Sequence, residues 1–190
     1  MHPRTFRLIL PLAAVALYGA TAAPSAMAST PSCDGHRATI VGTSSDDHIV
    51  GTSHADVIVT FGGDDTIRGG GGNDIICAGA GNDLVYGGDG NDTISEGDGN
   101  DVAYGGEGND TEQGGAGADH LYGNEDADTL EGQDGNDVLA GGTGCDLLEG
   151  GQGDDNEQGG PGSDTIQDDQ GSDIEDGGDG LDTVDGVQDV

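Results

Sequence analysis

The sequence of 190 residues contains no tryptophan, no lysine and only two phenylalanines, whereas 40 of its residues are glycine. So few large apolar side chains cannot fill the core of an ordinary compact domain of this length. Four basic residues stand against 38 acidic ones, which gives a net charge of -34. Nucleic acid and anionic lipid both bind basic surfaces, so neither is a predicted partner. The acidity alone fits either a disordered tail or a solvated surface.

The sequence also lacks the motifs of common hydrolases. It has no His-Glu-x-x-His and no Gly-x-Ser-x-Gly, the patterns of metalloproteases and of lipases. The glycine-rich run 69–72 has no lysine after it, so it is not predicted to hold a phosphate. Acidic pairs are frequent, but their proximity alone does not indicate acid–base chemistry. We therefore predict that the chain is not an enzyme.

The segment 1–28 has the pattern of a targeting sequence. Arg4 and Arg7 precede an apolar run over 8–23, and Ala26-Met27-Ala28 forms a small-x-small cleavage pattern. We predict a cleaved signal peptide over 1–28 and hence a secreted, extracellular protein. The apolar run is short for a membrane span, so no membrane insertion is expected after cleavage. A retained anchor helix is the alternative. Residues 29–41 are then a short N-terminal leader or cap.

From 42 to 185 one phrase of nine residues repeats without insertion or deletion, and 186–190 remain as a short tail. A clear copy is Gly-Gly-Asp-Gly-Asn-Asp-Thr-Ile-Ser over 87–95. The 144 residues divide into 16 phrases, and the sixth position is aspartate in every phrase. These residues are Asp47, Asp56, Asp65, Asp74, Asp83, Asp92, Asp101, Asp110, Asp119, Asp128, Asp137, Asp146, Asp155, Asp164, Asp173 and Asp182. Such a fixed period indicates a repeat architecture.

The phrase Gly-Gly-x-Gly-x-Asp-x-apolar-x resembles the repeats-in-toxin, or hemolysin-type, calcium-binding nonapeptide. The resemblance covers about three quarters of the chain and implies an all-β fold, a right-handed parallel β-roll of about 16 repeats. Two phrases would close one coil, with a three-residue strand at positions seven to nine and a glycine-rich turn at positions one to four.

Position eight would face the interior of such a roll, and it is aliphatic in most phrases. Glu112, Glu157 and Glu175 break this pattern. An unpaired internal carboxylate is costly and would protonate or open the coil, so we predict that the last third is the loosest part. The outward positions seven and nine mix residue types along the sequence, so no uniform row for an ordered ligand is predicted.

The resemblance implies that Ca²⁺ lies between turns on the same edge of successive coils. Carboxylates one coil apart would otherwise repel by about 3–4 kcal/mol. Ca²⁺ accepts carboxylate and carbonyl oxygens, whereas Mg²⁺ resists dehydration. All sixteen sixth-position aspartates are predicted ligands, for at most about 14 ions if each gap binds one, and folding is predicted to require them.

Some phrases depart from the motif at their turns. Ser45 and His54 replace the fourth-position glycine of the first two phrases, which predicts distorted turns or a cap. Asp126 replaces the same glycine in the tenth phrase, and Asp168-Asp169 replaces the opening glycines of the fifteenth. The fifteenth turn is therefore expected to differ from the others in its carbonyl geometry.

The three cysteines are Cys33, Cys77 and Cys145. In a roll of two phrases per coil, Cys77 and Cys145 would lie roughly 18 Å apart, beyond the limit of about 7 Å between the Cα atoms of a disulfide. Cys33 can fold back to Cys77 more easily. We therefore predict a Cys33–Cys77 disulfide with Cys145 left over, and three free thiols as the alternative.

Three functions follow as expectations. The first is a secreted calcium-binding protein whose folding depends on Ca²⁺. The second is a structural or adhesive module of a cell surface or extracellular matrix. The third is the detached repeat tail of an exported toxin or enzyme. No particular protein or polysaccharide partner is indicated.

Overall fold

The structure is a computed structural model that describes residues 31–167, 170–184 and 187–188. The predicted signal peptide, Asp168-Asp169 and most of the predicted tail lie outside these residues. Every element of regular structure in the described residues is a β-strand. None of these residues forms a helix long and apolar enough to cross a membrane.

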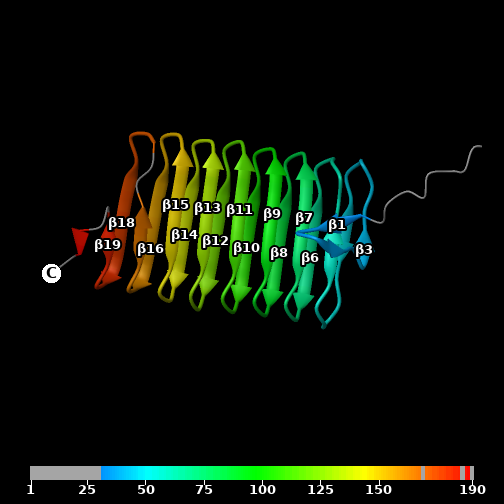
Figure 1. The fold of residues 1–190 in the computed structure, drawn as a ribbon, viewed down its shortest axis with the longest axis horizontal. Coiled ribbons are helices and arrows are strands. Elements are labelled where there is room, and N and C mark those ends of the chain that lie inside the picture. Colours follow the sequence, from blue (N-terminus) through cyan, green and yellow to red (C-terminus); the bar gives the residue numbers. More distant parts are fainter. Residues whose placement is uncertain (1–30, 168–169, 185–186, 189–190) are drawn as a thin grey trace, which may run out of the picture.

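The strands form two long sheets that face each other (Figure 1). The first has eight parallel strands: β4 (His48–Val50), β6 (Thr66–Gly71), β8 (Leu84–Asp89), β10 (Val102–Glu107), β12 (His120–Glu125), β14 (Val138–Thr143), β16 (Asn156–Gly162) and β18 (Ile174–Gly180). Each strand pairs with the strand two elements later, so that Leu84, for example, lies beside Val102. One coil of the roll therefore consists of two phrases.

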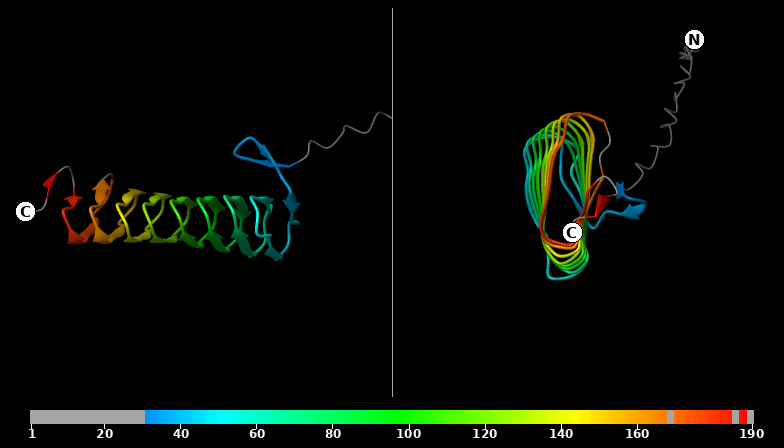
Figure 2. Two further views of the ribbon diagram at one scale, coloured as in Figure 1. Left: turned by 90° about the horizontal axis from the view of Figure 1, so that it is seen from below. Right: turned by 90° about the vertical axis from the view of Figure 1, so that its left-hand side faces the viewer.

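The second sheet has ten strands: β3 (Ile40–Val41), β5 (Val57–Val59), β7 (Ile75–Ala80), β9 (Thr93–Asp98), β11 (Thr111–Ala116), β13 (Thr129–Asp134), β15 (Leu147–Gln152), β17 (Thr165–Gln167), β19 (Thr183–Val184) and β20 (Val187–Gln188). All its pairs are parallel except β19 with β20. Along the roll axis the coils superimpose as a flattened oval (Figure 2). The fold is thus an all-β parallel solenoid of about eight turns.

The central strands are six residues long, so the expected three-residue strands were too short. Each of these six-residue strands continues through the first three residues of the following phrase. Glycine at the second position makes this continuation possible, because it adopts a positive φ while it stays paired with the next coil. Gly79, for example, has a φ of 112° and pairs with Gly97.

The core consists of the predicted aliphatic columns. Ile58, Ile76 and Ile94 follow one another in one sheet and are fully buried. In the eight-stranded sheet, Leu121 and Leu139 are likewise paired and fully buried. The aliphatic column of the ten-stranded sheet begins one coil before the first predicted phrase, because Ile40 pairs in register with Ile58 and packs against the core. The last residues of the predicted leader, 40–41, therefore already belong to the roll.

In the phrases that the structure describes at this point, position one also faces the interior. Because the strand continues past position nine, alternation places positions eight and one on the same side. Position one is glycine in twelve of the sixteen phrases. Among the exceptions, Ala78 and Glu96 are fully buried. The sequence did not predict the burial of Glu96, because position one was assigned to a turn.

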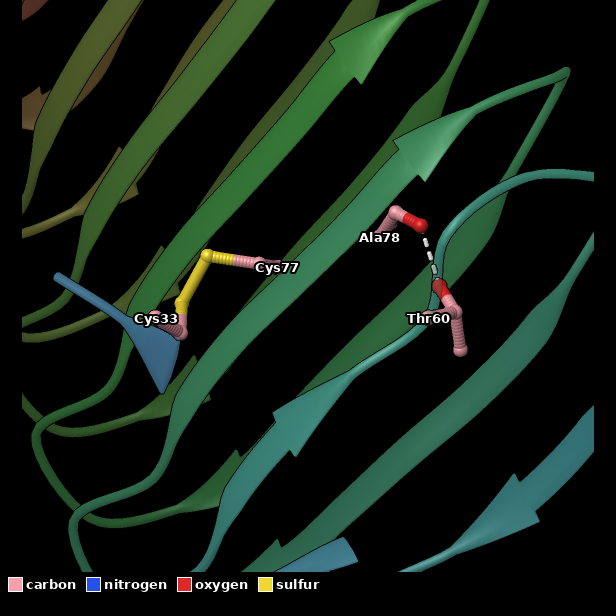
Figure 3. The surroundings of a disulfide bond; sticks show 4 residues. All are labelled: Cys33, Thr60, Cys77 and Ala78. Carbon is pink, nitrogen blue, oxygen red and sulfur yellow. Dashed lines mark hydrogen bonds between the residues drawn. A yellow bond between two sulfur atoms is a disulfide. The ribbon is translucent and has the colours of Figure 1, made fainter. Parts of the chain in front are cut away.

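The residues before the roll form a small hairpin, β1 (Ser32–Cys33) and β2 (His36–Arg37). A disulfide joins Cys33 to Cys77 on β7, with 5.8 Å between the Cα atoms (Figure 3). Cys145 is free and exposed. At the other end, β20 folds back against β19, so the C-terminal edge of the ten-stranded sheet is partly covered.

The outer faces mix residue types along the whole roll, as expected, but each sheet also carries a uniform run over three successive coils. Tyr86, Tyr104 and Tyr122 stack on the eight-stranded sheet, with ring centroids 5.1 and 4.9 Å apart. Thr93 and Thr111 belong to a threonine row on the ten-stranded sheet that continues to Thr129. Odd and even phrases lie in different sheets. Residues that are neighbours in one run are therefore 18 residues apart in the sequence, and a comparison of consecutive nine-residue phrases does not reveal the run.

Candidate metal sites at the turns

The sixteen sixth-position aspartates form two rows, one along each edge of the roll. Within a row, the backbone N–H of each aspartate donates to Oδ1 of the aspartate one coil later, as from Asp74 to Asp92 at 2.8 Å. The bond recurs for all fourteen successive pairs, at 2.7–3.0 Å. One row starts at Asp47 and ends at Asp173, and the other starts at Asp56 and ends at Asp182. One oxygen of each carboxylate from the second coil onward therefore holds adjacent coils together.

The second carboxylate oxygen has no such bond in most turns. Twelve Oδ2 atoms are buried without a hydrogen-bond partner: those of Asp65, Asp74, Asp83, Asp92, Asp101, Asp110, Asp119, Asp128, Asp137, Asp146, Asp164 and Asp182. A buried polar atom without a partner is costly and calls for an explanation, such as an ion.

In most phrases the glycine at position one makes the space around these oxygens. A Cβ added to Gly69 would lie against Asp74 Oδ2 and 2.6 Å from the carbonyl oxygen of Gly87, one coil on. At Gly132 the same position is 2.5 Å from the carbonyl oxygen of Gly150. At these glycines a carboxylate oxygen and a carbonyl oxygen of the next coil thus converge where a Cβ would intrude. Ca²⁺ prefers this type of ligand set.

Burial raises the pKa of several turn carboxylates above its ordinary range. Burial raises the pKa of Asp92, Asp101 and Asp128 to about 7, and the charges of neighbouring aspartates raise it further. Burial likewise raises the pKa of Asp83 and Asp137 to about 6. Ionised rows at neutral pH therefore need a compensating positive charge, and the basic residues of the chain are too few to supply one.

The first turn of each row is built differently. Asp47 Oδ2 accepts hydrogen bonds from the backbone N–H of Thr43 at 2.6 Å and from its hydroxyl at 3.1 Å. Asp56 Oδ2 accepts the same pair from Thr52, at 2.8 and 2.9 Å. The second position holds threonine here, so Oδ2 of these two predicted ligands already has protein partners. This arrangement agrees with the cap suggested by Ser45 and His54.

A second ladder, which the sequence did not predict, runs beside the aspartate rows. The backbone N–H of Asn100 donates to Asn82 Oδ1 at 3.0 Å, and that of Ala118 donates to Asn100 Oδ1 at 2.8 Å. The same bond links Asn91 with Asn73 on the other edge. The recurring Asn-Asp pair at positions five and six is the sequence signal for this ladder.

The internal glutamates do not interrupt the coils. Glu157 is almost fully buried, yet β16 pairs in register with both β14 and β18. Burial raises the pKa of Glu157 to about 8, and the charge of Glu175 raises it further. Of the two expected outcomes, protonation at neutral pH fits this geometry and an opened coil does not. The looseness of the last third stays a prediction.

Within the described residues, no three His, Cys, Asp or Glu side chains lie close enough to hold a metal ion by themselves. An ion at the turns would therefore need backbone carbonyl oxygens beside the aspartates, which the glycine-rich segments provide.

A family model of the RTX calcium-binding nonapeptide repeat, in four copies, matches the chain in overlapping stretches. The matched residues are 41–76, 59–94, 78–103, 97–130, 104–139, 113–148, 131–156 and 158–188. A search of the curated proteins finds no match.

Proposed function

The chain belongs to the RTX calcium-binding nonapeptide repeat family, and on this basis we propose that it is a secreted protein whose roll folds when Ca²⁺ fills the gaps between its turns. The observation that carries the proposal is the set of twelve buried Oδ2 atoms without a partner. The sixth-position aspartates would hold the ions, together with carbonyl oxygens of the first-position glycines one coil on. The proposal assigns no catalytic role to the chain.

Dependence of folding on Ca²⁺ follows from the charge of the rows. Carboxylates one coil apart repel, and burial removes the water that would screen them. The ordered core is narrow, since it consists mainly of two aliphatic columns. An unfolded chain has no preformed site, so the binding energy of the ions becomes folding energy.

Secretion is supported by two features of different kind. The segment 1–28 has the pattern of a signal peptide. The Cys33–Cys77 disulfide is typical of a protein from an oxidising compartment. Millimolar extracellular Ca²⁺ also lies within the range of the weakest protein calcium sites, about 10⁻⁴–10⁻³ M.

A calcium titration followed by circular dichroism tests the proposal. We expect a coil spectrum in chelator, a β spectrum in Ca²⁺, and little change in Mg²⁺ alone. Asp92→Asn should raise the Ca²⁺ concentration at the midpoint, because the orphaned Oδ2 is lost. Asp98→Asn removes the same charge from an exposed position of the following strand and should leave the midpoint near that of the wild type. Full strand content in excess chelator would refute the calcium-dependent fold.

A second candidate, a structural or adhesive surface module, is favoured by the row of Tyr86, Tyr104 and Tyr122. Arg68 extends this row, with its guanidinium 4.9 Å from the ring centroid of Tyr86. Co-sedimentation with cells or with polysaccharide, in Ca²⁺ and in chelator, distinguishes this function. Tyr104→Ser should abolish sedimentation if the row is the contact surface, and should leave the calcium titration unchanged.

A further inference from the structure

Glu96 and Glu112 lie inside the roll, where the repeat motif has glycine and an aliphatic residue. Both side chains are fully buried, and none of their four carboxylate oxygens has a hydrogen-bond partner. They lie on the adjacent strands β9 and β11. Glu112 is paired with Ile94, two residues before Glu96 on the same inner face. The two glutamates are therefore diagonal neighbours, close enough for long side chains to meet.

The surrounding core leaves room for these side chains. On the opposite sheet the inner residue of β10 is Ala103, the smallest of its column, between Val85 and Leu121. Glu112 Oε1 lies 2.8 Å from the point that a Cβ on Gly105 would occupy. The backbone of Gly105 partly offsets the raised pKa of Glu112, but no side chain of the described residues donates to either carboxylate.

The charges of the turn aspartates act on both glutamates of this pair. Burial raises the pKa of Glu96 well above its usual value, and Asp101 is the first of the charges that raise it further. Burial does the same for Glu112, followed by the charges of Glu96 and of Asp110. Asp101 and Asp110 belong to different aspartate rows, and both have an orphaned Oδ2. A series of four carboxylates therefore crosses the interior from one row to the other.

We propose that Glu96 and Glu112 form an internal Ca²⁺ site that lies between the two rows of turn sites. The inference rests on the proposed function, because the ion that fills the turns is also the ion available here. Two carboxylates balance the charge of one Ca²⁺, and an all-oxygen ligand set suits this cation. Buried carboxylates are tolerated when they are paired or bind a metal. Water would complete the coordination, because among the described residues no third carboxylate lies close enough to ligate the same ion.

Ion stoichiometry tests the site. Glu96→Gly/Glu112→Leu restores the residues of the motif at both positions and keeps all sixteen turn aspartates, so this variant is expected to fold. Equilibrium dialysis at saturating Ca²⁺ should give one ion fewer per chain than the wild type, and Glu96→Gln/Glu112→Gln should show the same loss. Glu107→Gln, in the same coil but exposed, is the control and should bind as many ions as the wild type.

The outcomes separate the two proposals. If the wild type and the motif-restoring variant bind equal numbers of ions, the internal site is refuted and the turn sites stand. If neither binds Ca²⁺, the proposed function fails as well. A shared proton is the competing explanation, and infrared spectroscopy detects it as a protonated-carboxyl C=O band. Loss of band intensity from the Ca²⁺-saturated wild type to Glu96→Gln/Glu112→Gln would overturn the proposal, whereas equal intensity in the two proteins supports it, because Glu157 contributes equally to both.

Discussion

The sixth-position aspartate has different hydrogen-bond partners in the first turn of each row and in the central turns. In the first turns, threonine at the second position donates both an N–H and a hydroxyl to Oδ2 of Asp47 and of Asp56. In most of the central turns that position is glycine, and Oδ2 is buried without a partner. The N–H and the hydroxyl of one threonine therefore give Oδ2 of the first turns the protein partners that Oδ2 lacks in most central turns.

The N-terminal coils also have a second source of stability. The β1–β2 hairpin is attached to β7 through the Cys33–Cys77 disulfide. The first coils are more open to solvent than the central ones, with Val50 61% and Phe61 50% exposed. We infer that the N-terminal coils form a cap that depends less on the metal, from which the calcium-dependent coils extend.

The largest effect that we expect is that removal of Ca²⁺ by a chelator unfolds the central coils but not the N-terminal coils. Without Ca²⁺, amides of the strands from β8 to β16 should exchange hydrogen freely, because their aspartate rows are uncompensated. Amides of β5 and β7 should keep partial protection. Hydrogen exchange with mass spectrometry measures both regions in one experiment. Equal loss of protection in the two regions would contradict the cap.

Acidification should partly replace the metal in the central coils. Asp92, Asp101 and Asp128 have a pKa of about 7 in the folded state, well above the unfolded value of about 4. The folded state therefore binds more protons between these limits, so metal-free stability should increase as the pH falls from about 8 to about 5. Circular dichroism in chelator across this range should show increasing β content. In Ca²⁺, acid should have the opposite effect, because protons compete with the ion.

Removal of the Cys33–Cys77 disulfide should have a smaller effect, which is to destabilise the N-terminal coils. Cys33 and Cys77 are 44 residues apart, and a loop of this length corresponds to about 3–4 kcal/mol in the chain-entropy model. Cys33→Ala/Cys77→Ala should lose the residual protection in chelator. In saturating Ca²⁺ the central coils should stay protected, and Cys145→Ala is the matched control because this thiol is free and exposed.

The smallest effect should come from a single hydroxyl. Thr52→Val keeps the shape and the backbone N–H but removes one hydrogen bond to Asp56 Oδ2, at a cost of about 1 kcal/mol. The amide protection of the first coils in chelator should fall slightly. Thr93→Val, on the outer face of β9, removes a hydroxyl from the threonine row and should leave the first coils unchanged.

Much of this organisation could be predicted from the repeat and from its resemblance to the RTX nonapeptide. A column of sixteen aspartates after glycine-rich positions predicts two rows of turns, and the aliphatic eighth position predicts the two core columns. The strand length could not be predicted, because the ladder continues through glycines that a residue-by-residue reading assigns to turns. The role of Thr43 and Thr52 was also missed, since replacement of one motif glycine does not reveal which oxygen the new side chain contacts.

The sequence by itself determined the repeat and the excess of acidic charge, because these depend only on residue type and spacing. Only the tertiary structure decided which residues meet. Coils of two phrases place alternate phrases in different sheets, so the tyrosine row, the threonine row and the diagonal pair of Glu96 with Glu112 arise from stacking. Residues that contact each other in adjacent coils are 18 positions apart in the sequence. Which residues these are depends on how many residues the backbone needs to complete one coil.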